Sequence, residues 1–167
     1  MNYHTKIQNI VDKATAKIAL IDEALMSKKL QPNKWSKKEI LGHLVDSAFI
    51  NHARFLKADL QNDLIFEGYD QDEWVKKNNY QSRSTESILS LWQNSNQHIS
   101  NLIEAIPEEL LLRKTKAHDF DKMCMQLLPA GVETNLAYLI WDYTYHIEYH
   151  LNQIIEGYEM SNGPFLD

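Results

Sequence analysis

The stretch YHIEYHLNQI, residues 145–154, places His146 and His150 four positions apart. On an α-helix, side chains at this spacing share one face with their Cβ atoms about 6 Å apart, so both imidazoles can bind the same ion. Neutral imidazole is a good ligand for Zn, Ni or Fe. The alternatives are two surface residues, or two core residues that a neighbouring Asp or backbone carbonyl satisfies. The spacing alone leaves all three interpretations open.

A metal held by His146 and His150 needs a third ligand from another helix, and His43 is the natural candidate. His43 borders the apolar stripe of a helix expected over residues 36–60. The same border continues as a polar column beside the core, formed by Ser47, Asn51 and Arg54. We expect this column to be one wall of a cavity. Three protein nitrogens leave a position open for water or substrate, which is typical of catalytic rather than structural zinc sites.

Four amphipathic segments must position these side chains. Apolar residues at a spacing of three and four predict helices over residues 4–27, 36–60, 84–105 and 134–156. Ser36 followed by Glu39 is the capping-box pattern that starts the second helix. Thr134 is the expected N-cap of the fourth helix. Pro107 ends the third helix and Gly157 stops the fourth.

No alternating strand pattern interrupts these segments, so the sequence predicts an all-α four-helix bundle. A chain of 167 residues has the length of one domain, and we expect residues 1–167 to form it. The connections over 61–83 and 108–133 are long, which predicts crossovers rather than the simplest up-and-down arrangement. The first contains large aromatics that should pack over the bundle, and the second should hold only short elements.

The facing angles of the fourth helix, at about 100° per residue, place His150 in the apolar stripe and His146 at its edge. Asp142 lies one further turn back on the same side, whereas Glu148 falls on the opposite side, which we expect to face solvent. The two histidines therefore point toward the interior. Three others lack partners at a useful spacing and are expected on the surface: His4, His98 and His118. His52 is better explained as a packing residue or a dimer contact.

The composition argues against several classes of partner. A net charge of −6 and the lack of a dense Lys/Arg run argue against nucleic acid as a partner. A hydrophobic content of 44% and a charged content of 24% are those of an ordinary globular protein. The single cysteine, Cys124, fits a reducing compartment. No apolar run suits a signal peptide or a membrane span, so we expect a cytoplasmic protein with no membrane partner.

Three stretches resemble a known family: residues 35–55 (WSKKEILGHLVDSAFINHARF), 66–74 (FEGYDQDEW) and 141–154 (WDYTYHIEYHLNQI). They are similar to the DinB-like superfamily, which includes the YfiT-type metal-dependent hydrolases and thiol transferases. The resemblance covers nearly the whole chain in order. It implies a four-helix bundle with long crossover connections and a divalent metal, Zn, Ni, Fe or Mn. The implied ligands are His43, His146 and His150.

The resemblance also implies a small-molecule substrate, an activated water or low-molecular-weight thiol such as bacillithiol or mycothiol, and a homodimer. In such a site Asp142 or Asp46 could orient an imidazole, and Arg54 or Asn51 could steady an anionic substrate. Residues 114–131 match no motif of the family, so the substrate stays open. The competing interpretation is a non-catalytic, stress-related helical dimer or binding module in which the metal is structural or absent.

Overall fold

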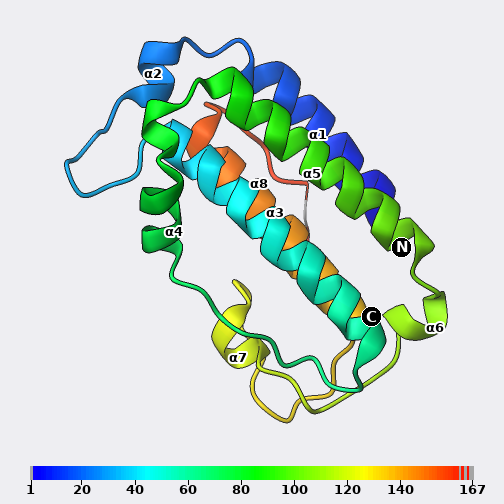
Figure 1. Cartoon of the computed structure of the whole chain (residues 1–167). Coiled ribbons are helices and arrows are strands. Elements are labelled where there is room, and N and C mark those ends of the chain that lie inside the picture. Colours follow the sequence, from blue (N-terminus) through cyan, green and yellow to red (C-terminus); the bar gives the residue numbers. More distant parts are fainter. Residues whose placement is uncertain (1, 162, 164, 166–167) are drawn as a thin grey trace.

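Four long helices lie side by side in the computed structural model, which describes residues 2–161, 163 and 165 (Figure 1). They are α1 (Tyr3–Ile18), α3 (Lys37–Leu60), α5 (Thr85–Ala105) and α8 (Leu136–Ile154). α1 packs on α5, α5 on α3, and α3 on α8, which in turn contacts α1. The described residues form no β-strand, so the predicted all-α four-helix bundle is confirmed. None of the helices in these residues is both long and apolar enough to span a bilayer.

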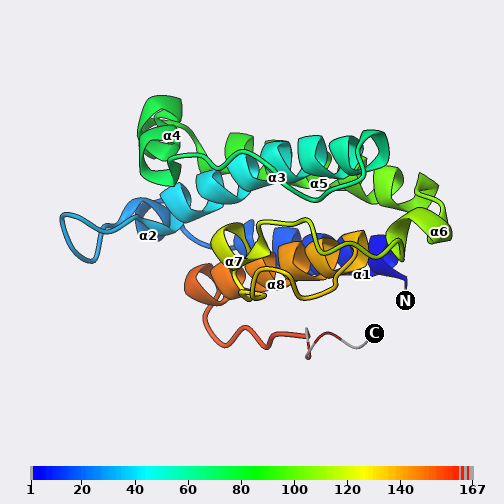
Figure 2. The same cartoon turned by 90° about the horizontal axis from the view of Figure 1, so that it is seen from below.

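The direction of the helices explains the first long connection. α3 and α5 run the same way and form one layer, while α1 and α8 run the opposite way in the other layer (Figure 2). Because α3 and α5 are parallel, the chain between them must return along a helix of 24 residues, about 36 Å. This return carries α4 (Gln71–Asn78) and the 3-10 helix η1 (Tyr80–Ser82). The second connection carries only two short helices, α6 (Glu108–Leu111) and α7 (Phe120–Met123).

Local capping starts two of the long helices as predicted. The Oγ of Ser36 accepts from the backbone N–H of Glu39 at 3.1 Å, and the Glu39 carboxylate accepts from the N–H of Ser36 at 2.8 Å. This is the complete capping box at the start of α3. Ser84 caps α5 by accepting from the N–H of Ser87 at 3.3 Å.

Three helix boundaries differ from the prediction, one of them the end of α8, which lies at Ile154 with Ile155 as the C-cap rather than at residue 156 before Gly157. The helix expected over 4–27 is broken, because Asp22 accepts from the N–H of Ala24 at 2.8 Å and starts the separate helix α2 (Glu23–Ser27). The N-cap of α8 is Asn135 rather than Thr134. The backbone of Thr134 is instead paired with Thr115 through hydrogen bonds of 2.8 and 2.9 Å, which tie the second connection to the start of α8.

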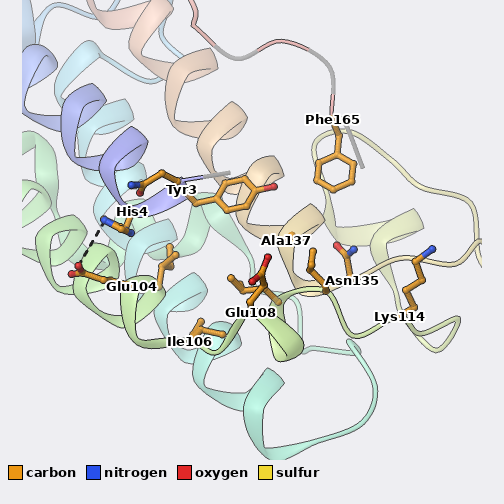
Figure 3. Close-up of a pocket in the computed structure, with 13 residues that line it drawn as sticks. Tyr3, His4, Glu104, Ile106, Glu108, Lys114, Asn135, Ala137 and Phe165 are labelled. Atoms are coloured by element: carbon orange, nitrogen blue, oxygen red, sulfur yellow. Dashed lines mark ion pairs between the residues drawn. The ribbon is translucent and has the colours of Figure 1, made fainter.

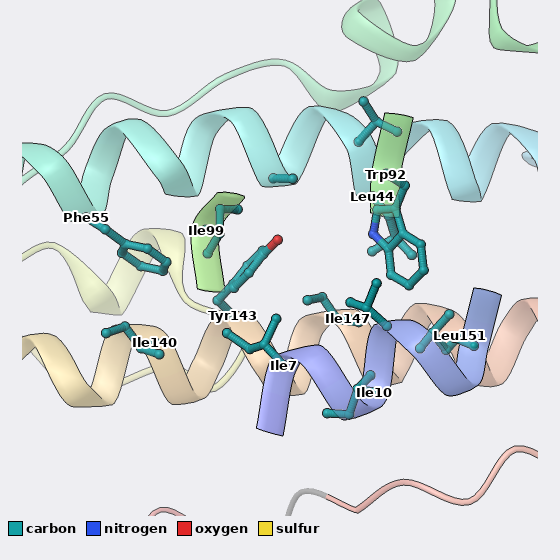
Figure 4. Packing of buried hydrophobic residues seen from close by; sticks show 14 of the residues in the cluster. Ile7, Ile10, Leu44, Phe55, Trp92, Ile99, Ile140, Tyr143, Ile147 and Leu151 are labelled. Atoms are coloured by element: carbon teal, nitrogen blue, oxygen red, sulfur yellow. The ribbon is translucent and has the colours of Figure 1, made fainter. Parts of the chain in front are cut away.

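The core fills the space between the two layers with aromatic and aliphatic side chains (Figure 4). Trp92, Phe55 and Tyr143 are among its largest fully buried members. The one hydroxyl among them is satisfied, since Tyr143 donates to the Oδ1 of Asn96 at 2.7 Å. Asn96 in turn donates to the Trp92 carbonyl at 2.9 Å. Of the polar groups on these three side chains, the Tyr143 hydroxyl is paired, whereas the Trp92 Nε1 is buried without a partner.

The first connection, residues 61–83, is called the first crossover below, and the second, residues 108–133, the second crossover. The first crossover packs on α3 beside His43. A Cβ atom at Gly42 would lie 2.2 Å from the ring of Tyr80, so only glycine fits under this ring. One turn further along α3, Asp46 accepts from the Tyr80 hydroxyl at 2.7 Å and from the Asn78 amide at 2.9 Å. These contacts hold one face of α3 against the crossover, and His43, the residue after Gly42, consequently faces α8.

Candidate metal centre

The imidazoles of His43, His146 and His150 meet where α3 passes α8. One ring nitrogen from each lies within 4.8 Å of the other two, and the Nε2 atoms of His43 and His146 are 3.0 Å apart. No other group of three or more His, Cys, Asp or Glu residues in the described part of the chain has this geometry. The structure thus brings together the three histidines that the sequence nominated.

The antiparallel pairing of α3 and α8 explains why these residues meet. The start of α3 lies against the end of α8, where the Lys37 ammonium donates to the Ile154 carbonyl at 2.6 Å. His43 follows shortly after the start of α3, and the pair on α8 precedes its end by one to two turns. His43 is fully buried and its ring lies 5.0 Å from that of Trp35, whereas His146 and His150 are partly buried.

All three imidazoles are held in the neutral form that binds metals. Burial, with a smaller effect of His150, lowers the pKa of His43 to about 3. Burial also lowers the pKa of His146 well below its usual range and lowers that of His150. The Nδ1 of His150 lies 2.8 Å from the amide oxygen of Gln153. Because an amide oxygen only accepts, this contact places the proton on Nδ1 and leaves Nε2 free.

The donor set fits a divalent metal. Three neutral imidazole nitrogens suit Zn, Ni or Fe. Nitrogen ligands at 2.0–2.1 Å from a tetrahedral zinc are about 3.3 Å apart, close to the 3.0 Å between the two Nε2 atoms. Among the described residues, the one hydrogen-bonding contact of the His43 Nε2 atom is with the Nε2 of His146. The nitrogens of His43 and His146 thus already have the spacing of two ligands, and the nitrogen of His150 lies within 4.8 Å of both.

A polar cavity of about 160 Å³ adjoins the cluster at His146. Its lining includes all four residues that the sequence proposed around the histidines, namely Ser47, Asn51, Arg54 and Asp142. Both crossovers contribute to the walls, the first through Tyr69 and the second through Met123. Burial raises the pKa of Tyr69 to about 12, so its phenol keeps the proton and can donate. The predicted polar column is thus one wall of a real cavity.

Ser47 connects this wall to the cluster. Its Oγ lies 3.4 Å from the Nδ1 of His146, and the Asn51 amide donates to the Ser47 Oγ at 3.2 Å and to the Ser47 carbonyl at 2.9 Å. The chain from Asn51 through Ser47 to His146 steadies the imidazole on the side away from the other two histidines. Partners of this kind normally fix the ring of a metal ligand.

The two carboxylates considered as orienting groups have other partners. Asp142 accepts from the backbone N–H groups of Gln126 at 2.7 Å and Met125 at 3.1 Å, and so anchors the second crossover over the cavity. Asp46 accepts from the first crossover on the far face of α3. Neither carboxylate has a hydrogen bond to His43 or His146 in the structure. Burial raises the pKa of both acids.

Two residues expected at the surface are buried. Glu148 is 0% exposed, because the segment after α8 folds back and donates to its Oε1 from the Tyr158 hydroxyl and from the N–H and hydroxyl of Ser161. His118 is buried in the second crossover, where its Nε2 lies 2.8 Å from the Val132 carbonyl. Both expectations were wrong because the covering segments carry no periodic signal in the sequence.

A larger cavity of about 820 Å³ lies at the other end of the bundle, between the start of α1, the end of α5 and the start of α8 (Figure 3). His4 lines it and its Nε2 is 3.8 Å from the carboxylate of Glu104. The described part of its lining offers no third ligand beside this pair. Of the other histidines, His98 is exposed as expected and its ring centroid lies 4.7 Å from that of His52.

Fold and site together define a helical bundle that holds a histidine cluster between two antiparallel helices. The chain belongs to the DinB superfamily, whose model matches residues 11–154. Its structure is similar to that of YfiT from Bacillus subtilis, described as a probable metal-dependent hydrolase with an unusual four-helix bundle topology. The TM-score is 0.73 at 14% identity, over 91% of this chain and 81% of YfiT, a likeness that shows the fold. No curated protein matches the sequence.

Proposed function

We propose that this protein is a metal-dependent enzyme that acts on a small-molecule substrate, with a divalent metal on His43, His146 and His150. The carrying observation is the convergence of three neutral imidazoles beside a polar cavity. A metal at this position would lower the pKa of a bound water or thiol and so supply a nucleophile at neutral pH.

The surrounding residues have separable tasks in this proposal. Ser47 and Asn51 steady the imidazole of His146, and Gln153 fixes the tautomer of His150. Trp35 lies against the ring of His43 and shields it from water. The two crossovers wall the cavity, so a substrate enters a space bounded by polar groups of α3 and α8.

Elemental analysis tests the metal site. Protein purified without added metal should contain a stoichiometric divalent ion, whose identity among Zn, Ni, Fe and Mn the same measurement gives. His43→Ala, His146→Ala and His150→Ala should each lose it. His98→Ala is the matched control, because His98 is an exposed histidine outside the cluster. Metal-free wild-type protein that also fails to take up added metal would overturn the proposal.

The reaction class is either hydrolysis or transfer of a low-molecular-weight thiol. The description of YfiT supports a hydrolase, and the resemblance to the thiol transferases supports the second class. A panel of esters and amides, and in parallel a panel of thiols with an electrophilic acceptor, separates the two when assayed with each metal. Turnover should disappear in the three cluster variants. Bound metal without turnover on either panel would favour the non-catalytic binding module.

We propose that the chain folds as one domain and assembles as a homodimer. The dimer is supported by the outer face of α3, which exposes Phe49, Leu56 and Leu60 by 53%, 43% and 84%. Apolar side chains gathered on one helix face commonly mark an interface. Light scattering should give twice the chain mass, and Phe49→Asp should shift it to the monomer. A monomeric wild-type protein at micromolar concentration would refute the assembly.

A further inference from the structure

Arg54 is the cation of the polar column, and it has no acidic partner. The residue is 8% exposed and lines the cavity together with His146. Its Nη2 donates to the Glu67 carbonyl at 3.2 Å, whereas its Nε is buried without any partner. No ion pair to Arg54 within 4.0 Å is present among the described residues. A buried guanidinium with unused donors is costly, so it needs a reason beyond packing.

The two nearest acids do not provide that reason. Both oxygens of Asp142 accept backbone N–H groups of the second crossover. Asp119 accepts through Oδ2 from the N–H of Phe66 at 3.1 Å and links the two crossovers, whereas its Oδ1 is buried without a partner and makes no hydrogen bond to Arg54. The charges of both acids act on Arg54 from a distance, without a direct hydrogen bond. The two negative charges stabilise the buried guanidinium of Arg54 electrostatically, but they do not use its hydrogen-bond donors.

The cavity limits what can pair with Arg54. Its volume of about 160 Å³ is well below the roughly 300–1,000 Å³ of sites for drug-sized ligands. Lys122 of α7 adds a second positive charge to the lining, and Asp142 adds a carboxylate whose two oxygens already accept backbone N–H groups. Asn51 and the protonated hydroxyl of Tyr69 add neutral polar groups. Such a space suits a small molecule with one acidic end.

We propose that Arg54 is the anion-recognition residue of this cavity and that the substrate is a small carboxylic acid. Its carboxylate pairs with the guanidinium, and the rest of the molecule extends toward His146. The planar fork of arginine matches a carboxylate and can bind it through two parallel hydrogen bonds. The substrate assignment rests on the proposed function, whereas the binding of a carboxylate at Arg54 does not.

The test compares succinate with its neutral analogue succinamide at constant ionic strength, by calorimetry and by ligand-induced thermal stabilisation. Wild-type protein should bind succinate saturably and succinamide much more weakly. Arg54→Gln should weaken succinate binding by about tenfold or more, as expected for the loss of a charge-assisted hydrogen bond. Arg54→Lys keeps the charge but loses the fork, and should fall between the two.

Arg113→Gln is the matched control. Arg113 also donates from Nη2 to backbone carbonyls, in its case those of Ala58 at 2.8 Å and Gln61 at 2.6 Å at the end of α3, but unlike Arg54 it does not line the cavity. It should leave succinate binding unchanged. Two results would overturn the proposal: equal binding of succinate and succinamide, or succinate binding that both Arg54→Gln and Arg54→Lys retain in full. Either result would assign Arg54 to neutralising Asp119 and Asp142.

His43→Ala separates this inference from the proposed function, because His43 belongs to the cluster but does not line the cavity. Carboxylate binding that depends on Arg54 and persists in His43→Ala supports the inference, even where wild-type protein proves to bind no metal. Conversely, a metal-loaded enzyme that turns over neutral and acidic substrates equally well, with no loss in Arg54→Gln, supports the metal site and rejects the inference.

Discussion

Buried polar side chains lie on two opposite faces of α8, and they differ in what satisfies them. On one face, Glu148 is 0% exposed, and the protein itself supplies partners for its Oε1, which accepts hydrogen bonds from Tyr158 and Ser161, whereas its Oε2 is buried without a partner. On the other face, the partly buried His146 and His150 lie beside a third imidazole, and one ring nitrogen of each of the three lies within 4.8 Å of the other two.

We infer from this difference that the Glu148 face of α8 has a structural role and the histidine face a functional one. The bonds at Glu148 fasten the chain after α8 to the bundle, and such a paired network stabilises one conformation. The imidazole cluster stabilises nothing comparable, because burial makes charging any member unfavourable and neutral nitrogens that face one another gain little. Three ring nitrogens that converge at ligand spacing without protein donors between them point to a bound ion. Arg54, with its unpaired Nε, lines the cavity beside this cluster.

The largest expected effect is the acid sensitivity of the cluster in metal-free protein. The pKa of His43 falls from 6.5 to about 3 on folding, so below pH 6.5 the unfolded chain binds a proton that the folded chain does not. The free energy of unfolding should therefore be full above pH 6.5 and decrease as the pH falls toward 3. The contribution of His43 alone should be about 3 kcal/mol at about pH 4.

Urea unfolding between pH 7 and pH 4 measures this loss. His43→Gln should flatten the dependence on pH, because the variant no longer contributes a group whose pKa changes on folding. Equal slopes for His43→Gln and wild type would show that His43 is not held neutral, and the distinction between the two faces of α8 would lose its basis.

An intermediate effect on the free energy of unfolding is expected on the face of α8 that carries Glu148. Glu148→Ala removes the acceptor for Tyr158 and Ser161 and should lower the free energy of unfolding by about 2 kcal/mol. The segment after α8 should become sensitive to protease, while metal content stays at the wild-type level. Glu156→Ala, at an exposed position two residues beyond the end of the same helix, is the control. If Glu148→Ala lost as much metal as His146→Ala, the two faces of α8 would not differ in role.

The smallest effect is expected at the ion pair of Glu23 and Lys38, whose carboxylate is exposed although the Lys38 side chain is buried. A hydrogen bond from Lys38 lowers the pKa of Glu23 from 4.5 to about 2. The stabilisation is therefore present above pH 4.5 and disappears as the pH falls from 4.5 toward 2. Because Glu23 is largely exposed, Glu23→Gln should cost less than about 1 kcal/mol at pH 7. Denaturation curves that still separate the variant from wild type at pH 2 would contradict this.

Much of the bundle could be predicted, because it depends on neighbours in sequence. The Ser36 and Glu39 pair started α3 where expected, since a capping box needs only one turn of chain. The break at Asp22 was missed because the apolar spacing continues across it. Thr134 was a reasonable N-cap by type, but its backbone is used in the pairing with Thr115, and Asn135 takes the role.

The candidate site likewise has features that the sequence determined and features that only the fold decided. The spacing of His146 and His150 determined by itself that they share one face of a helix, and the polar column from Ser47 to Arg54 was equally visible. Only the tertiary structure decided that the Nε2 of His43 lies 3.0 Å from that of His146. It also decided that Glu148 is buried while Arg54 keeps a free donor. Helical periodicity is a property of a few adjacent residues, whereas burial and pairing depend on segments that meet only when the chain has folded.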